Sequence, residues 1–307
     1  MNKDNRFYKY MILVLCLLIV LCGFFAFQST TEDKKSIITV IVNDSSSDRW
    51  ERLKLGIKHA ASDNNVNVNF VSTNRFTSSE EKEIIDDYLT SSDAFLIDIE
   101  DSNDSSTIIS ELLKHGPVVQ INTSSKESTT ETKVIVDSKQ IGNSLASEVI
   151  LKHKEDIEDK KIGIVTGSLK NRTNLDCTES FKESILKYDA KITWEIESID
   201  SIDLNSIDIL IVCNALELES LPSIDNNIEV YGIGGSLIDI NKLDTGIITS
   251  LIVVNDYYTG YEAITMLAKK IKNRLITIED LTTPYYVVNK QNLYSSRYQT
   301  LLFIDRS

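Results

Sequence analysis

The sequence predicts an α/β protein of two doubly wound parallel-sheet lobes joined by a hinge and preceded by one N-terminal transmembrane helix. Three observations lead to this prediction. The first residues contain an uninterrupted apolar run, the rest of the chain alternates short β-branched runs with longer amphipathic stretches, and that alternation restarts near residue 132. With 307 residues, 42% of them hydrophobic, the chain is long enough for two domains with cores of their own.

The apolar run extends from Met11 to Phe27, close to the roughly 20 residues that a bilayer-spanning helix needs. Basic residues precede it and acidic residues follow it, so the positive-inside rule keeps the N-terminus cytoplasmic and exports the remaining chain. A retained anchor is favoured, because no pair of small residues marks a cleavage site and a leucine precedes both Cys16 and Cys22, where a lipobox needs a small residue. A lipoprotein signal and a cleaved signal peptide stay as alternatives.

The first part of the exported chain alternates between two periodicities. β-branched runs predict strands, and apolar residues at helical spacing predict the helices that connect them. Strands are expected at 37–42, 66–71, 94–99 and 117–122, and helices at 49–64, 78–91 and 105–116. This alternation implies parallel strands with right-handed helical crossovers, which is the doubly wound arrangement.

The same pattern then restarts. Strands are expected at 132–137, 161–167, 191–198, 207–214, 228–235, 245–254 and 282–289, and helices at 139–154, 175–189 and 256–273. The chain therefore divides into a cytoplasmic tip and membrane segment at 1–30, a first lobe at 36–136 plus 255–279, and a second lobe at 137–254 plus 280–307. Two such lobes leave a cleft between them, where small-molecule sites are common.

Composition and motifs exclude several functions. A net charge of −14 without a basic cluster argues against a nucleic-acid partner. Gly167 stands alone in the loop after a predicted strand, so the glycine-rich turn of a nucleotide site is missing and no cofactor is expected.

Histidines and cysteines give no sign of catalysis or metal binding. His59, His115 and His153 have no evident carboxylate or nucleophile partner, so surface positions are expected and an enzyme is not. The cysteines show no metal spacing, while a Cys177–Cys213 bridge stays open in principle.

The order of several segments carries a family resemblance over about residues 36–290. These segments are ITVIVNDSSSDRWERLKLGIKHAA, DAFLIDIEDS followed by GPVVQIN, VIVDSKQIGNSLASEVI, IGIVTGSLKNRTNLDCTESFKESI, VYGIGG and VVNDYYTGYEAITML. Together they resemble the type I periplasmic substrate-binding family, the fold shared by ribose- and galactose-binding proteins and by the sensory half of LacI repressors. A repressor is disfavoured, because an apolar segment stands where the DNA-reading helix-turn-helix would be.

The resemblance implies that a ligand lies between the lobes and suggests which residues contact it. The candidates are Asp48, Arg49, Trp50, Asn122, Asp137, Arg172 and Asn214. For five of them a plainer role stays open. Trp50 could cap the core, the two charged residues before it could be solvated, and Asn122 could form a turn, while Asp137 is expected to shape the hinge.

Four positions depart from the family pattern that the resemblance implies. Cys177 stands where the resemblance implies a sugar-clamping Arg, Gly234 where it implies an Asp, and Val254 where it implies a Gln. Asn214 matches the family pattern, but Ala215 stands where an Asp often follows that Asn. Arg172 is expected to replace the missing Arg by reaching in from the loop.

These observations predict an extracytoplasmic solute-binding protein that closes over a small polar ligand, with a sugar expected. It would serve an ABC importer or present its closed form to a membrane sensor histidine kinase, and the N-terminal helix would hold it at the membrane. The alternative is an enzyme or an interaction module of the same fold that binds no sugar.

Overall fold

The structure is a computed structural model that describes residues 11, 13–20, 35–42, 48–72, 86–98, 105–122, 132–224 and 227–302. The side chains of residues 48, 49, 105, 106 and 300 are outside this description. The chain separates into two compact units, residues 1–36 and residues 37–307.

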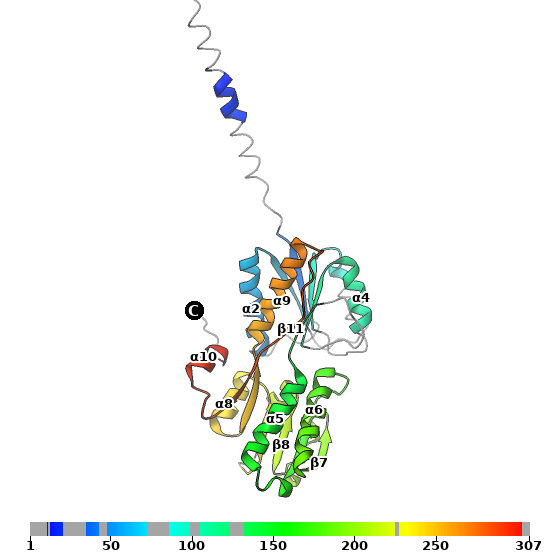
Figure 1. The fold of residues 1–307 in the computed structure, drawn as a ribbon, viewed down its shortest axis with the longest axis vertical. Coiled ribbons are helices and arrows are strands. Elements are labelled where there is room, and N and C mark those ends of the chain that lie inside the picture. Colours follow the sequence, from blue (N-terminus) through cyan, green and yellow to red (C-terminus); the bar gives the residue numbers. More distant parts are fainter. Residues whose placement is uncertain are drawn as a thin grey trace, which may run out of the picture. The chain divides into compact units, whose positions relative to one another are not determined.

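In the first unit, residues 13–20 are helical (Figure 1). Their large apolar side chains are exposed. No helix formed by the described residues is long and apolar enough to cross a membrane. The predicted anchor at Met11–Phe27 falls partly outside these residues, since position 12 and positions 21–27 are not described.

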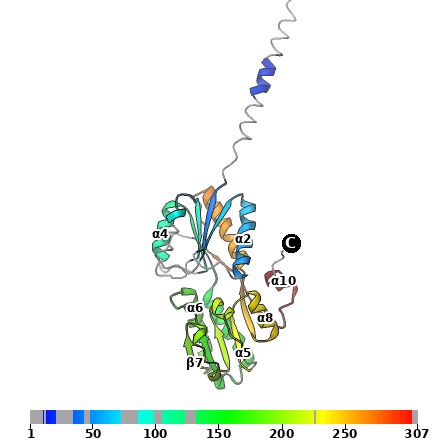
Figure 2. The same ribbon diagram turned by 180° about the vertical axis from the view of Figure 1, so that it is seen from behind.

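Within the second unit, lobe 1 is built on a six-stranded parallel sheet with the order β11-β5-β4-β3-β1-β2. The strands are β1 (Ile37–Val42), β2 (Asn67–Ser72), β3 (Ala94–Ile97), β4 (Val118–Ile121), β5 (Thr132–Ile135) and β11 (Leu281–Thr282). Helices α2 (Asp48–Asn64) and α9 (Asp256–Lys272) cover one face, and α4 (Ser105–His115) covers the other (Figures 1 and 2). Alternating residues of β1 serve the two cores, as a pleated strand requires.

Lobe 2 is built on a second six-stranded sheet with the order β12-β10-β9-β8-β6-β7. Its strands are β6 (Lys161–Val165), β7 (Lys191–Ile196), β8 (Ile209–Val212), β9 (Glu229–Ile233), β10 (Ser250–Val254) and β12 (Tyr285–Asn289). Helices α5 (Ser138–His153) and α6 (Arg172–Ile185) pack on one face, while α7 (Ala215–Glu219), α8 (Leu237–Thr245) and α10 (Ser296–Leu302) pack on the other. The predicted pair of α/β lobes is therefore confirmed, although β12 runs antiparallel to β10.

Several predicted elements differ in detail. The single strand expected at 282–289 is two strands, because β11 pairs with β5 in lobe 1 and β12 pairs with β10 in lobe 2. The strand expected at 245–254 begins only at Ser250, since α8 occupies the residues up to Thr245. Helix α6 begins at Arg172, earlier than expected, because the Asn171 side chain accepts a hydrogen bond from the Thr173 N–H and caps it.

Three helices and the position of one histidine differ from what the sequence predicts. Helices α7, α8 and α10 were not anticipated, and the helix expected at 78–91 lies mostly outside the described residues. His153 is not a surface residue: it is 7% exposed, with Nε2 2.9 Å from Glu229 Oε2 and Nδ1 3.2 Å from Asp156 Oδ1.

The chain crosses between the lobes three times. The crossings follow β5 before α5, β10 before α9, and β11 before β12. Because strands of both sheets end at these crossings, the polar residues that follow those ends face the junction of the lobes.

Candidate functional site

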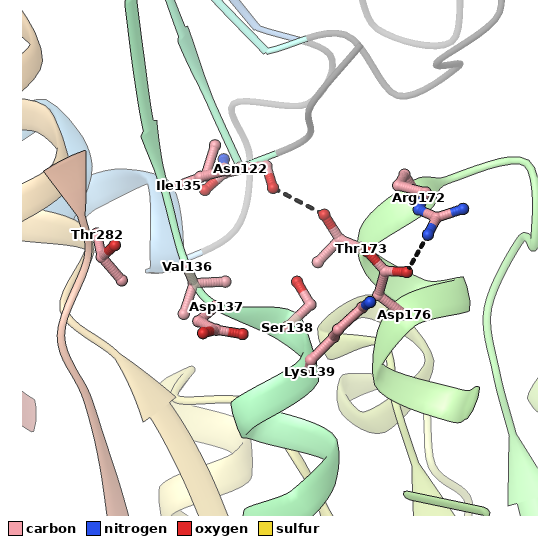
Figure 3. A pocket seen from close by; sticks show the side chains of 10 residues that line it. All are labelled: Asn122, Ile135, Val136, Asp137, Ser138, Lys139, Arg172, Thr173, Asp176 and Thr282. Atoms are coloured by element: carbon pink, nitrogen blue, oxygen red, sulfur yellow. Dashed lines mark hydrogen bonds and ion pairs between the residues drawn. The ribbon is translucent and has the colours of Figure 1, made fainter. Parts of the chain in front are cut away.

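A cavity of about 270 Å³ lies between the lobes beside the first crossing (Figure 3). We call it the hinge cavity. It is lined by Asn122, Ile135, Val136, Asp137, Ser138, Lys139, Arg172, Thr173, Asp176 and Thr282. Three of the seven predicted ligand contacts therefore share one cavity, with residues of lobe 1 on one side and of α5 and α6 on the other.

Asn122 follows the carboxyl end of β4 and joins the two sides of the hinge cavity. Its φ of 62° is left-handed, a conformation that Asn tolerates better than most residues. Its Nδ2 donates to Asp98 Oδ2 at 2.8 Å, and its backbone carbonyl accepts a hydrogen bond from Thr173 Oγ1 at 2.8 Å. The turn expected at Asn122 is thus present, and it links lobe 1 to the first turn of α6 (Figure 3).

Arg172 opens α6 and places its guanidinium at the hinge cavity. Its Nη2 lies 2.6 Å from Asp176 Oδ1, one turn further along the helix. The Arg172 side chain is 34% exposed and that of Asp176 19%, so the pair is reached by solvent. A paired guanidinium and carboxylate offers both hydrogen-bond donors and acceptors, the combination that sugar hydroxyls use.

Asp137 serves the local structure at the first crossing. Its Oδ1 accepts a hydrogen bond from the Gln140 N–H at 3.0 Å and caps α5. The carboxylate still lines the hinge cavity, so the expected hinge-shaping residue also borders the candidate site.

The loop after β6 brings two asparagines together. A Cβ on Gly167, whose φ is +70°, would lie 2.7 Å from Asn174 Nδ2 and 2.7 Å from the Cβ of Asn214, so only glycine fits. Asn214 Oδ1 accepts the N–H groups of Leu216 and Glu217 as the cap of α7, and its Nδ2 lies 3.4 Å from Asn174 Oδ1. Asn214 is therefore held at the end of β8, apart from the residues of the hinge cavity.

The remaining predicted contacts lie elsewhere. Trp50 is 9% exposed and packs in the core of lobe 1, and it does not line the hinge cavity. Asp48 and Arg49 lie in the first turn of α2, and their side chains are outside the described part.

Cys177 is fully buried in the core of lobe 2 beside Cys213, and both thiols are free. A hydrogen bond with Cys213 and burial both raise the pKa of the Cys177 thiol. The position where relatives carry a sugar-clamping Arg thus belongs to the core in this chain. Thr173, Asn174 and Asp176, on the same helix, were not among the predicted contacts.

Metal binding has no support in the described part of the chain, where no three histidine, cysteine or acidic side chains gather to hold an ion. The arrangement between the lobes offers amide, hydroxyl, guanidinium and carboxylate groups instead. Two α/β lobes with a polar cavity at the strand ends define a two-lobed solute-binding protein.

Comparison with known families agrees with this class. Residues 38–207 match the family described as periplasmic binding protein domain, which is more than half of the chain. The protein belongs to this family. No curated protein was found to match the sequence.

Solved structures share the fold at low sequence identity. GanP, a glucose-galactose binding protein from Geobacillus stearothermophilus, is 18% identical with a TM-score of 0.76, and the match covers 85% of this chain and 100% of GanP. An ABC transporter solute-binding protein from Agrobacterium vitis bound to α-D-tagatopyranose is 14% identical with a TM-score of 0.76, over 87% and 99% of the chains. A chain of the XylFII-LytSN complex is 18% identical with a TM-score of 0.71, over 84% and 98%.

Proposed function

We propose that the protein is an extracytoplasmic solute-binding protein that closes its two lobes over a small polar ligand, and that this ligand is a sugar. The observation that carries the proposal is the hinge cavity, where Asn122 and Asp137 meet the Arg172–Asp176 pair across the lobe junction. Neighbours of the same fold that are named for glucose-galactose binding or solved with tagatopyranose support the choice of a sugar.

Membrane tethering through the apolar run at Met11–Phe27 forms part of this proposal. It rests on the length and flanking charges of that run alone. Carbonate extraction of membranes, with intact mass of the extracted chain, separates a retained helix from a lipid-modified or cleaved N-terminus.

A thermal-shift screen of the full chain in detergent tests the ligand. A sugar present at about 100 times its Kd stabilises the native state by about 2.7 kcal/mol, which raises Tm by roughly 5–11 °C. The probes are D-glucose, D-galactose, D-arabinose and D-tagatose, followed by disaccharides. If none of these sugars raises Tm, the sugar proposal is wrong.

Variants of the hinge cavity show where a sugar binds. Arg172→Ala should reduce the affinity by about tenfold or more, since a charged hydrogen bond contributes about 1.5–3 kcal/mol. Lys187→Ala, which removes an exposed cation of lobe 2 outside the cavity, is the matched control and should leave the affinity unchanged. Unchanged affinity in Arg172→Ala would show that this residue does not replace the missing Arg.

Two partners fit a closed, ligand-bound form: an ABC permease and a sensor histidine kinase. The neighbour solved in the XylFII-LytSN complex supports a protein partner of the kinase kind only by showing that this fold forms such complexes, while the neighbour named as an ABC transporter solute-binding protein supports an importer. Two measurements in cells that carry or lack the chain distinguish these partners. Sugar uptake that depends on the chain would support the permease, and sugar-dependent phosphorylation of the kinase that depends on the chain would support the kinase.

A second candidate function is an interaction module that binds no sugar. The burial of Cys177 and the glycine at position 234 favour it, because the family resemblance implies a polar sugar contact at each of these positions and this chain has none there. A negative sugar screen together with an unchanged interlobe distance in every sugar would support this module.

A further inference from the structure

A second, much smaller cavity lies at the lobe junction around Arg52. Its volume is about 20 Å³, about enough for one water molecule. We call it the Arg52 cavity. It is lined by Arg52, Ala215, Leu216, Glu219, Ile233, Gly234, Gly235, Ser236, Asp239, Val254 and Asp256.

Arg52 reaches from α2 of lobe 1 to lobe 2 and is almost completely buried. It is 5% exposed, its Nη1 donates to the carbonyl oxygen of Gly235 at 2.6 Å, and its Nη2 lies 3.7 Å from Asp256 Oδ2. Gly235 lies between β9 and α8, so the shorter of these two contacts joins the two lobes. Arg52 Nε is buried and has no hydrogen-bond partner among the described residues.

Hydrogen bonds within lobe 2 hold the turn that contains the Gly235 carbonyl. Asp239 Oδ2 accepts the N–H of Gly235 at 2.9 Å and that of Ser236 at 3.0 Å, while Ser236 Oγ accepts the Asp239 N–H at 3.1 Å. This capping box holds the first turn of α8 in one conformation. The carbonyl that Arg52 meets is therefore preorganised by lobe 2 itself.

Glycine at positions 234 and 235 leaves the room that the guanidinium needs. A Cβ on Gly235 would lie 2.8 Å from Arg52 Nη2, and a Cβ on Gly234 would lie 2.6 Å from Asp239 Oδ2. A Cβ at position 235 would also lie 3.1 Å from Val253 Cγ1, so an alanine there would require the buried Arg52 guanidinium to shift. The absence of side chains at positions 234 and 235 thus leaves space for Asp239 and for Arg52.

Core stability alone is a poor reason for this arrangement. A buried guanidinium that leaves a donor without a partner is often no better than an apolar side chain of similar volume. The contact with Gly235 requires α2 of lobe 1 and the turn before α8 of lobe 2 to lie together, and a charge-assisted hydrogen bond is about twice as strong as a neutral one. The contact therefore favours this arrangement over any arrangement in which the two segments have separated.

We propose that Arg52 is a closure residue: a positioning residue on lobe 1 that holds the Gly235 carbonyl of lobe 2 and thereby stabilises the closed cleft, with or without ligand. The inference rests on the proposed function only in that the cleft opens and closes. Because ligand affinity depends on the fraction of molecules that are competent to close, weakening this contact lowers affinity by at most the factor by which it lowers closure.

Interlobe distance in the full chain tests the proposal without any sugar. Spin labels on keto-bearing unnatural amino acids replace the exposed Lys58 of α2 and the exposed Lys187 of lobe 2, so the native cysteines stay in place. In the otherwise unchanged chain we expect a populated short distance. Arg52→Ala should reduce the ratio of short to long distances by about 10- to 100-fold.

Two further variants guard against misfolding and unspecific effects. Gly235→Ala keeps the Arg52 charge but displaces the guanidinium, and should shift the distances in the same direction as Arg52→Ala. Lys114→Ala removes a cation whose ion pair with Glu111 lies within lobe 1, and should change nothing. Circular dichroism checks that each variant is folded.

Each outcome decides one of the two proposals. Unchanged distances in both Arg52→Ala and Gly235→Ala, or a single long distance in the parent chain, would overturn the closure role. A shift in both variants, combined with a negative sugar screen, would keep the closure role and reject the sugar.

Discussion

Two threonines on α6 provide a matched pair for testing how the lobes are joined. Thr173 Oγ1 donates to the Asn122 carbonyl of lobe 1 at 2.8 Å, whereas Thr178 Oγ1 is buried without a partner among the described residues. Replacement by valine keeps the shape of each side chain and removes only the hydroxyl. Thr173→Val should therefore weaken the contact between the lobes, whereas Thr178→Val should raise the thermal stability.

The size of each effect follows from the hydroxyl's surroundings. Thr173→Val loses one neutral hydrogen bond, a net contribution of about 0.5–1.5 kcal/mol, so the ratio of closed to open molecules should fall about 2- to 10-fold. Thr178→Val removes a desolvated hydroxyl that gains nothing in return, so Tm should rise by about 2–4 °C for each kcal/mol recovered.

The assay combines the label distance between positions 58 and 187 with thermal unfolding. Thr173→Val should change the distance distribution, and Thr173→Ser, which keeps the hydroxyl, should restore it. Thr178→Val should change Tm alone. If Thr173→Val leaves the distances of the parent chain unaltered, the hydrogen bond to Asn122 does not hold the lobes together.

Three other outcomes are expected. Gly56→Ala should lower the free energy of unfolding by about 1–3 kcal/mol, because the added Cβ would lie 2.1 Å from the Tyr257 carbonyl oxygen on α9. Alanine in place of glycine usually stabilises a helix, so a higher Tm of this variant would contradict the close packing of α2 on α9. Burial raises the pKa of Glu229, but hydrogen bonds from His153, Lys152 and Tyr231 outweigh it and leave that pKa below its usual value. The stability that Glu229 contributes is therefore complete above about pH 4.3 and is lost as pH falls through the lowered pKa. The Tm difference between the parent chain and Glu229→Gln should shrink in acid, and a constant difference would refute the pairing. With Cys16 and Cys22 replaced by serine, maleimide at pH 8 should leave Cys177 and Cys213 of the native protein unmodified and should modify both after denaturation. Both thiols are buried and the pKa of Cys177 is raised, so rapid labelling of the native chain would show that the core of lobe 2 opens.

Strands were the most predictable part of the fold, because buried parallel strands are short β-branched runs. The run IITVIV became β1 at the expected residues, and ILIV of β8 lies within its predicted range. The five residues of α7 are too few to show helical periodicity, and its cap Asn214 was interpreted as a ligand contact. A short helix of this kind is stabilised by its cap and its packing more than by its sequence.

Side-chain burial was harder to infer than secondary structure. His153 continues the helical stripe of Leu145 and Val149, so its position one turn further along α5 could have predicted burial. No such pattern marks Arg52. It lies on α2 between the apolar Trp50 and Leu53, and the partners of its guanidinium, Gly235 and Asp256, are far away in sequence.

The candidate site was predictable to the extent that it depends on strand ends. Asn122 and Asp137 end predicted strands and Arg172 lies in the loop after one, and the three line the same cavity. Asn171 and Thr173 were missed because their roles arise from the capping geometry of α6 and from a contact 51 residues away in sequence.

The path of the chain between the lobes has a consequence for synthesis. Helix α9 packs directly on α2 and closes the core of lobe 1, yet it ends at Lys272, 235 residues after β1 begins at Ile37. At about 5–20 residues per second, roughly 10–50 s pass between the translation of the first strand and that of the last helix of the same core. Throughout that time lobe 1 lacks α9, so its core cannot be completed until nearly all of the chain has been made.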